Sequence, residues 1–507
     1  MAKKIILGIA VLLLLFVSLF PRGVDVLNGN PIFDIDQGRD YMAVKSIVVD
    51  HKLTLIGAEL GAGQAGLQYL FHGPGYFYAL TIPFILFQGN PVGGVWLMLL
   101  FGLSAIACGI YLTSKLFGWK EGLLMGFLIA LCPFFIGQSR FFENHFPVTF
   151  FILLVFYCVY RFTKNAKQSN FVFFAALISA AIYNFEFAVA VPLCITLFIY
   201  CLIIFRRKVI SCLPILIAGY VLGFLPMILF ELRHGFLGIK SLLMYIFVYH
   251  PPHASSPTIA VHGQNILNLF TYSFSDSFPG RLVLPVGIVL VGFIILVWFT
   301  YSQEKNSVKK NFIFYILMLF PVNFAVFLLL RNIVFQHYII DLFLANLLLV
   351  TYGVSSLYKR GHVKTATLIC IYLAYLVTIG TYSSYTTSIY DYSDPGGVHK
   401  LKAKIEAIDF IYRDAGKEPF GLLVFSPPVY TYPYDYLVWW RGSRKYGYIP
   451  YSDKKGTFYL LIEKDIEKPW SYLGWEETVV KTGKVVFTKK LPKSGFIIEK
   501  RIVEKPL

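Results

Sequence analysis

Charged residues are scarce in this sequence of 507 residues, of which only 14% are Asp, Glu, Lys or Arg. Ordinary soluble domains contain about 25% charged residues. The chain is 57% hydrophobic and has a mean hydropathy of +0.65, values that are typical of helices facing lipid. The shortage of charge therefore excludes a water-soluble core as the main architecture.

Several chemical signatures are also missing. No CxxC or similar metal-ligand spacing occurs, and the seven cysteines lie inside or at the ends of apolar runs, as small buried hydrophobic residues do. The sequence has no Gly-rich phosphate-binding loop, so no nucleotide substrate is expected. The net charge of +17 is spread over short basic clusters between apolar runs, which argues against a nucleic-acid partner.

Long apolar runs are abundant and predict eleven transmembrane helices, because about 20 apolar residues are enough to cross a bilayer as a helix. No small-x-small cleavage site follows the first run, which is therefore expected to remain as the first helix. The predicted spans are residues 5–21, 92–115, 120–137, 146–163, 170–184, 187–205, 209–231, 282–302, 311–330, 337–357 and 364–382.

A twelfth apolar run, at residues 76–87, is expected to lie along the outer interface without crossing. In that arrangement the basic clusters between spans face the cytoplasm, as the positive-inside rule requires. The outer face then receives most of the acids near the spans and every histidine except His362. Acids and histidines are the groups that proton transfer and phosphate chemistry need, so this face is the predicted functional face. The positive-inside bias alone is the simpler explanation.

The composition changes after the last apolar run. Alternating apolar patterns at 421–426, 457–462, 485–488 and 495–499 predict strands, and helical spacing predicts a helix at 397–415. The sequence therefore predicts a polytopic α-helical module over residues 1–385, with a long first outer loop at 22–91. A small extracytoplasmic α/β domain is predicted over residues 386–507.

The first outer loop contains the densest polar cluster, which includes Asp34, Asp36, Arg39 and Asp40. A carboxylate at this position can take a proton from an acceptor hydroxyl, especially if partial burial raises its pKa. Structural roles are equally compatible with the pattern. Asp36 is placed to cap a helix beginning at Gln37, and Asp40 is placed to pair with a neighbouring base.

A second motif in this loop is the run 71–78, in which His72 is followed by Gly73-Pro74-Gly75 and by aromatic residues. A Gly-Pro-Gly turn lets the backbone approach a ligand closely, and it equally suits a tight turn before an interfacial aromatic helix.

The order of these elements resembles the GT-C superfamily of membrane glycosyltransferases. The closer resemblance is to the protein O-mannosyltransferases and to the aminoarabinose transferase that modifies lipid A. It covers the topology of the whole chain, and specific motifs over about residues 30–90 and 138–146. The resemblance implies a GT-C-like fold and assigns the catalytic base to Asp36, with Asp34 and Asp40 as close alternatives. It places a second catalytic acid at Glu143.

One motif departs from the aminoarabinose transferases, which have Lys-Pro-Pro where this chain has His72-Gly73-Pro74. The departure argues against the same substrate. Phosphate contacts are expected from residues at the outer ends of the spans, since arginine binds phosphate through paired hydrogen bonds. These candidates are Arg233, His234, Arg331, His337 and Tyr338. Snorkelling of arginine to the interface is the alternative explanation.

The sequence and the resemblance together predict transfer of a sugar from a polyprenyl phosphate to an acceptor hydroxyl, with inversion. The acceptor is a protein, a lipid or a glycan, and residues 236–280 are expected to form a mobile loop over the donor. The expected location is the plasma membrane, with the active site and C-terminal domain outside. A divalent metal is compatible with Asp34, Asp36 and His72, although their spacing does not indicate one. A flippase of lipid-linked glycans and a non-enzymatic scaffold are the alternatives.

Overall fold

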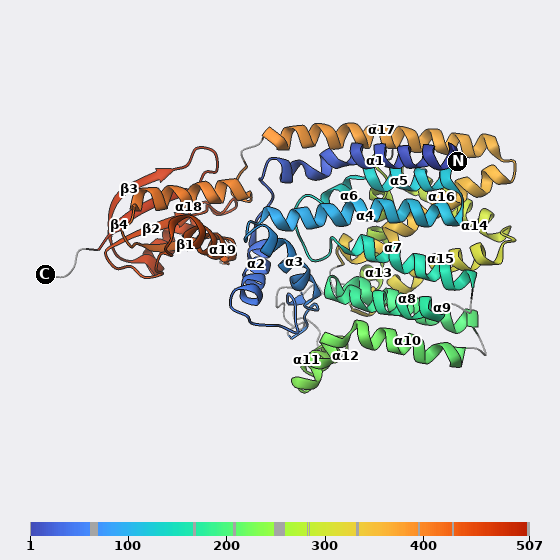
Figure 1. The fold of residues 1–507 in the computed structure, drawn as a ribbon, viewed down its shortest axis with the longest axis horizontal. Coiled ribbons are helices and arrows are strands. Elements are labelled where there is room, and N and C mark those ends of the chain that lie inside the picture. Colours follow the sequence, from blue (N-terminus) through green and yellow to red (C-terminus); the bar gives the residue numbers. More distant parts are fainter. Residues whose placement is uncertain are drawn as a thin grey trace.

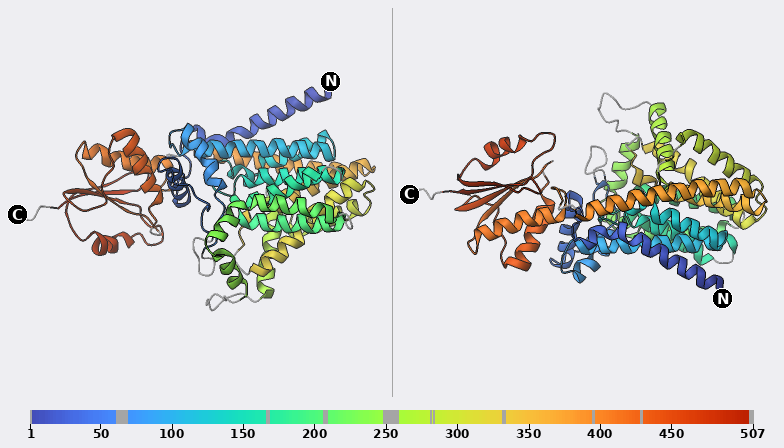
Figure 2. Two further views of the ribbon diagram at one scale, coloured as in Figure 1. Left: turned by 60° about the horizontal axis from the view of Figure 1, so that its bottom comes forward. Right: turned by 90° about the horizontal axis from the view of Figure 1, so that it is seen from above.

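The computed structural model describes residues 2–60, 69–165, 169–205, 209–247, 259–280, 282, 284–330, 334–393, 396–427 and 430–503. Most of the chain forms a bundle of long helices lying side by side, and a small domain with a β-sheet stands at one end (Figure 1). Two further directions show the same separation (Figure 2). The architecture is the predicted one, a polytopic helical protein with a C-terminal α/β domain.

The bundle contains helices at all the ranges that the apolar runs predict. Its longer helices are α1 (Ala2–Leu27), α4 (Val92–Leu116), α5 (Trp119–Leu131), α7 (Val148–Lys164), α8 (Ser169–Ala181), α9 (Phe187–Phe205), α10 (Val209–Gly223), α13 (Ile259–Asp276), α14 (Val286–Ser302), α15 (Ser307–Leu330), α16 (Ile340–Lys359) and α17 (Val363–Ser393). Shorter elements join them: α6 (Pro133–Gly137), η2 (Ile182–Asn184), α11 (Leu225–Arg233), α12 (Leu237–Phe247) and η4 (Gln336–Ile339).

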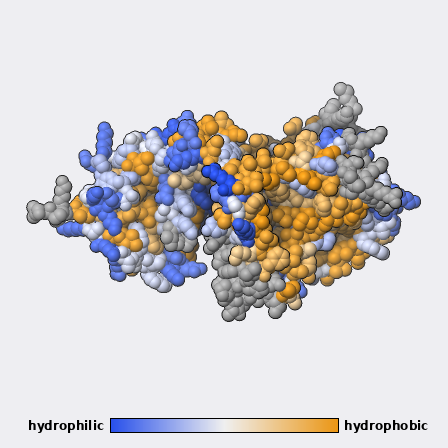
Figure 3. Space-filling model, turned by 90° about the horizontal axis from the view of Figure 1, so that it is seen from below, coloured by the Kyte–Doolittle hydropathy of each residue, from blue (hydrophilic) through white to orange (hydrophobic). Residues whose placement is uncertain are grey.

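Six of the described helices are long and apolar enough to cross a membrane, and a seventh span results if the bent pair α10–α11 counts as one. The predicted count of eleven is therefore not confirmed. Apolar side chains cover the helical part of the face drawn in Figure 3, whereas hydrophilic ones dominate the C-terminal domain. The protein is thus an integral membrane protein whose bundle faces lipid.

Burial differs strongly between helices of similar hydropathy. The apolar window of α16 is entirely buried, whereas only 22% of the α17 window is buried. Helix α16 therefore forms the centre of the bundle, and α17 exposes most of its apolar surface, as a helix at a lipid boundary does.

The described parts of the predicted loop at 236–280 form helices α12 and α13, whereas residues 248–258 of this range lie outside the described residues. Helix α13 packs against α15 and α16. A ring nitrogen of His262 lies 3.0 Å from the carbonyl oxygen of Phe327 on α15. The polar residues of this segment suggest a loop. In the structure the buried ring of His262 has a hydrogen-bonding partner inside the bundle, so a helix can form there.

The first predicted outer loop contains two helices, α2 (Ile35–Val48) and α3 (Gly75–Leu86). Both lie at the end of the bundle next to the C-terminal domain, as expected for an interfacial helix (Figure 1). The preceding helix α1 continues through Pro21 to Leu27, beyond the predicted end of the first span. Helix α2 begins at Ile35 with Asp34 as its N-cap residue, so the capping role considered for Asp36 belongs to Asp34.

The C-terminal domain follows α17, which runs to Ser393. Its helices and strands are α18 (Leu401–Ala415), β1 (Gly421–Phe425), α19 (Tyr432–Arg441), η5 (Gly442–Tyr446), β2 (Thr457–Ile462), α20 (Ser471–Trp475), η6 (Glu476–Val480), β3 (Lys484–Lys490) and β4 (Ile497–Ile502). The sheet order is β1-β2-β4-β3, in which β1 and β2 are parallel and the other pairs are antiparallel. The strands match the alternating patterns of the sequence.

Helix α19 docks this domain onto the first loop by packing against α2. Gly38 of α2 lies so close to α19 that a Cβ atom there would be 2.3 Å from the backbone nitrogen of Pro433. The indole N–H of Trp440 donates a hydrogen bond to the carbonyl of Gln88 over 3.1 Å. The C-terminal domain therefore packs directly against α2, the helix that carries the acidic cluster.

Candidate active site

Helix α2 carries the acidic cluster in its first two turns. The backbone N–H of Asp34 donates to the side chain of Gln37 over 2.9 Å, as in a capping box. Asp36 and Asp40 are four residues apart and therefore lie on one face of the helix. The Gln37 amide also donates to the carbonyl of Phe142 over 3.2 Å, which fixes α2 against the segment between α6 and α7.

Arg39 joins the two acids on this face. Its guanidinium lies 2.7 Å from a carboxylate oxygen of Asp36 and 2.8 Å from one of Asp40. The Asp36 side chain is 57% exposed, whereas that of Asp40 is 1% exposed. Burial raises the pKa of Asp40 to about 6, although Arg39 favours its charged form. Asp36 is therefore the acid of the pair that solvent or a substrate can reach.

Glu143, between α6 and α7, is close enough to both acids to respond to their charges. Burial and then the negative charges of Asp36 and Asp40 raise the pKa of Glu143 to about 8, while Gln37 and Arg39 have smaller opposing effects. Carboxyl groups from two separate segments of the chain thus meet at one place. At neutral pH Glu143 is mostly protonated, so it can donate a hydrogen bond there.

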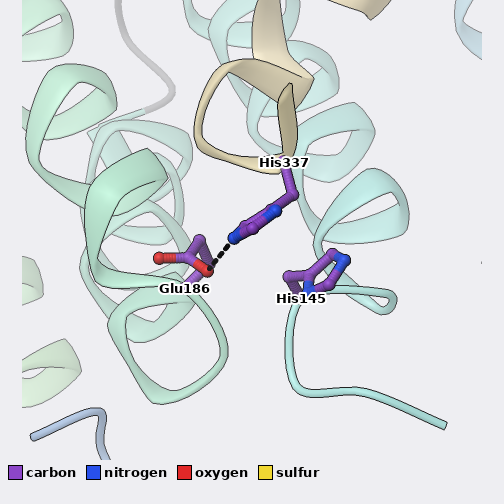
Figure 4. Close-up of side chains that lie close together, drawn as sticks. All are labelled: His145, Glu186 and His337. Carbon is purple, nitrogen blue, oxygen red and sulfur yellow. Dashed lines mark ion pairs between the residues drawn. The ribbon is translucent and has the colours of Figure 1, made fainter. Parts of the chain in front are cut away.

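A second group of side chains adjoins Glu143, and Figure 4 shows three of its members, His145, Glu186 and His337. Nδ1 of His145 lies 3.4 Å from a carboxylate oxygen of Glu143. The rings of His145 and His337 stack with their centroids 4.3 Å apart, and Nε2 of His337 lies 3.9 Å from Oε2 of Glu186. Glu186 precedes α9 and His337 belongs to η4, so two further segments of the chain converge beside the segment of Glu143 and His145.

His72 belongs to the same region. Its Nδ1 accepts a hydrogen bond from the backbone N–H of Phe187 over 3.4 Å. Burial, and then the charges of Arg39 and His337, lowers the pKa of His72 to about 3, so its imidazole is neutral. The turn after it approaches another segment of the chain, because a Cβ atom on Gly73 would lie 2.3 Å from the amide oxygen of Asn184. The turn thereby holds His72 beside η2 and Glu186.

Two cavities lie among the helices of the bundle. A cavity of about 530 Å³ is lined by Gln336, the neighbour of His337, and by Phe278 and residues of α6 and α17. A second cavity of about 400 Å³ also contacts Phe278 and is lined almost wholly by apolar side chains of α13, α14, α16 and α17. The larger cavity has Ser275, Asp276 and Gln336 in its wall, and the Gln336 amide donates to Asp276 over 2.9 Å. Neither cavity is lined by the acids of the α2 cluster, by Glu143 or by His337 itself.

The remaining predicted site residues lie in varied places. Asp34 pairs with His399 of the C-terminal domain over 2.6 Å. Arg233 and His234 are exposed at the end of α11, where the His234 ring contacts Phe230 of its own helix.

Two further residues predicted to contact phosphate, Tyr338 and Arg331, lie in or just before η4 in the sequence. Tyr338 packs edge-on against His337, with ring centroids 4.6 Å apart. Arg331 lies outside the described residues.

His145 and Glu186 were not predicted as site residues. The signal for them was present, since the topology had placed Glu186 and nearly all histidines on the outer face. Their convergence depends on the packing of α7, α9 and α16, which no local motif in the sequence encodes. Among the described residues, His145, Glu186 and His337 form a group whose ligand atoms all lie within 4.8 Å of one another.

The fold and this site define a class of protein. A family model described as dolichyl-phosphate-mannose-protein mannosyltransferase matches residues 71–230, the part of the chain that contains His72, Glu143, His145 and Glu186. The match covers less than half of the chain, and it agrees with the resemblance to the GT-C superfamily of membrane glycosyltransferases that the sequence suggests.

Two solved structures of one protein share the fold. ArnT from Cupriavidus metallidurans, bound to undecaprenyl phosphate, aligns with a TM-score of 0.58 and 12% sequence identity, covering 100% of this chain and 99% of that chain. The same protein in the apo state aligns with a TM-score of 0.57 and 12% identity, covering 98% of each chain. At this identity the likeness concerns the fold. No curated protein sequence matches the chain.

Proposed function

We propose that this protein is a glycosyltransferase that moves a sugar from a polyprenyl phosphate to an acceptor hydroxyl at the extracytoplasmic face of the membrane, with inversion. The observation that carries the proposal is the meeting of Asp36, Asp40 and Glu143, which come from two separate segments of the chain. The family match and the lipid-bound relative of the same fold support the lipid-linked donor.

The acceptor oxygen attacks the anomeric carbon of the donor sugar. As its bond to carbon forms, its proton passes to Asp36, and the bond between the anomeric carbon and the phosphate oxygen breaks. Polyprenyl phosphate leaves with the electron pair. Base assistance of this kind is worth about a factor of a hundred to ten thousand in rate. Asp36 suits the role because its carboxylate is oriented by Arg39 and remains exposed.

Glu143 has a different role in this scheme. Its raised pKa keeps it mostly neutral at pH 7, which favours hydrogen bonding to the acceptor or the sugar over electrostatic stabilisation of positive charge. The predicted phosphate contacts remain part of the proposal, with His337 best placed because its neighbour Gln336 lines the larger cavity. Arg233 and Arg331 are proposed to contact the phosphate from the adjoining segments, and the two cavities are proposed to hold the prenyl chain.

The test is transfer of a labelled sugar from polyprenyl phosphate by purified protein, comparing Asp36→Asn with the wild type. Asparagine keeps the size of the side chain and removes the base. The expected result is a fall in kcat/KM by about a hundredfold or more, with unchanged thermal stability.

Asp50→Asn is the matched control, because Asp50 lies in the same loop, is exposed and pairs with Lys45 away from the cluster. This variant should keep the rate of the wild type. Near-full activity of a folded Asp36→Asn protein removes the proposed base. Movement of the intact lipid-linked donor between leaflets without transfer would instead indicate a flippase.

A further inference from the structure

Of the group formed by His145, Glu186 and His337, the proposed transfer chemistry uses only His337, as a contact to the phosphate. Two imidazoles and one carboxylate from three separate segments face a common space (Figure 4). Their side chains are 13%, 4% and 31% exposed, so the group is largely shielded and opens to solvent on the side of His337.

The spacing of these side chains is unsuited to direct hydrogen bonding but suited to a shared ion. The distance of 3.9 Å between Nε2 of His337 and Oε2 of Glu186 is too long for a hydrogen bond. Two bonds of about 2.1 Å to one metal ion span up to about 4.2 Å. The other oxygen of Glu186 accepts a hydrogen bond from the backbone N–H of Ala188 over 3.1 Å, which leaves Oε2 directed at His337.

The neighbouring contacts fix the segments that carry the three side chains. The Asn144 amide donates to the carbonyl of Phe185 over 2.6 Å, so the residues preceding His145 and Glu186 are directly joined. Glu143 lies against Nδ1 of His145 at 3.4 Å.

We propose that His145, Glu186 and His337 form a binding site for one divalent transition-metal ion, with Zn²⁺ as the best chemical match. Two histidines and one glutamate are a familiar zinc ligand set, and they leave a coordination position open. Mg²⁺ and Ca²⁺ prefer oxygen ligands, which two imidazoles do not supply. The ligand atoms lie within 4.8 Å of one another, and a tetrahedral ion needs a separation of about 3.4 Å. Binding therefore requires the stacked rings of His145 and His337 to rotate until both point at the ion.

A role for the ion follows from the charges around it, and this role rests on the proposed function. Arg39 pairs with Asp36 and Asp40, and Arg140 pairs with Asp25 and Asp391, so both guanidinium groups are already neutralised. A metal ion beside Gln336 supplies positive charge next to the larger cavity. Such a charge suits the phosphate of a lipid-linked donor.

The test is metal binding by the full-length protein in detergent, without a polyhistidine tag and after removal of metal with a chelator. We expect the wild type to bind one equivalent of Zn²⁺ and to show a higher Tm when Zn²⁺ is added. Co²⁺ in place of Zn²⁺ should give the visible absorption of a four- or five-coordinate site.

Glu186→Gln and His337→Ala should each weaken Zn²⁺ binding by about a hundredfold or more and remove the Co²⁺ absorption. His337→Ala is the safer variant for folding, because His337 is the most exposed of the three. His362→Ala is the control, since His362 is exposed and follows α16 at the other end of that helix, and it should bind Zn²⁺ like the wild type.

Equal Zn²⁺ affinity in the wild type and in folded His337→Ala and Glu186→Gln proteins overturns the proposal, as does failure of the wild type to bind. These measurements use no donor lipid, so their outcome is separate from that of the transfer assay. A protein that transfers sugar but binds no metal would retain the proposed function and lose this site.

Discussion

At the scale of single residues, the candidate site concentrates negative charge around one guanidinium group. Asp36 and Asp40 are ion-paired with Arg39, and Glu143 responds to the charge of both acids. Burial is the main reason that the pKa values of Asp40 and Glu143 rise to about 6 and about 8, and the neighbouring negative charges raise them further. Acid–base catalysis commonly uses a protonated carboxyl group, such as Glu143, next to an ionised carboxylate.

Asp40 gives a prediction about pH. Its pKa is about 6 in the folded protein and ordinarily 3.8, so between these values the folded state binds more protons than the unfolded state. The stability that a protonated Asp40 provides is therefore fully present below about pH 4 and is lost as the pH rises through 6. Asp40→Asn should flatten the dependence of Tm on pH between about 4 and 6.

The groups that act on Asp40 are Arg39, Asp36, Tyr76 and Glu143, all of which the Asp40→Asn variant retains. Thermal unfolding in detergent over this pH range measures the effect, and Asp50→Asn serves as the control. An unchanged slope in Asp40→Asn would show that Asp40 titrates normally in the folded protein.

The sequence predicts that a residue belongs to the site only where that residue is part of a local motif. The pattern of charges in the first loop indicated Asp36, Arg39 and Asp40, and the resemblance to the GT-C superfamily indicated Glu143. His145 and Glu186 carry no local pattern of their own, and their positions depend on how distant helices pack. The sequence groups Asp34 with the site residues. In the structure Asp34 is the N-cap residue of α2 and pairs with His399, which are structural roles.

At the scale of helices, a buried arginine explains how a break between two apolar helices is tolerated. Pro133 has no N–H to donate to the carbonyl of Ile129 at the end of α5. The guanidinium of Arg22, on α1, donates to this carbonyl over 2.9 Å and also to that of Ala130. A carbonyl group that has no hydrogen-bond donor inside a bilayer destabilises the folded protein. The hydrogen bonds from Arg22 therefore stabilise the junction of α5 and α6.

Arg22→Leu should therefore destabilise the bundle. Two buried carbonyls lose their donor, and each unsatisfied acceptor costs about 1–3 kcal/mol, so we expect a loss of about 2 kcal/mol or more. Denaturant unfolding in detergent measures this change. Arg413→Leu is the control, since Arg413 is exposed and contacts only a carbonyl of its own helix, and it should change stability by less than about 0.5 kcal/mol. Similar losses in both variants would contradict the role of Arg22.

Helices were the most predictable part of the fold, because lipid-facing sequence must be apolar over its whole length. Helix α13 was the exception. Its sequence includes His262, Gln264, Asn265 and Asn268, and these polar residues concealed a helix that packs inside the bundle. Helix α19 was also not predicted, since its role is to pack against α2.

At the scale of the whole molecule, the C-terminal domain is part of the site's support. Helix α19 packs on α2, and Lys400 of the domain pairs with the buried Asp25 at the end of α1 over 2.9 Å. The position of Asp36 therefore depends on a domain that lies more than 350 residues away in sequence. Alternating apolar patterns predicted the strands of this domain, but the docking surface required three-dimensional contact.

Gly38→Ala tests this dependence. A Cβ atom at position 38 would lie 2.3 Å from a backbone atom of α19, which cannot move without shifting the domain. We expect faster limited proteolysis between α17 and α18 and a fall of about tenfold or more in transfer rate. Gly397→Ala is the control, because a Cβ atom there meets open space. Wild-type proteolysis and activity in Gly38→Ala would show that the domain docks independently of α2.

The most direct test of the account is to identify both products of the reaction with purified protein and a labelled polyprenyl-phosphate sugar. The account predicts that each sugar transferred releases one polyprenyl phosphate and that the anomeric configuration of the glycosylated acceptor is inverted. Failure of a folded, lipid-reconstituted protein to release polyprenyl phosphate from any such donor would contradict it.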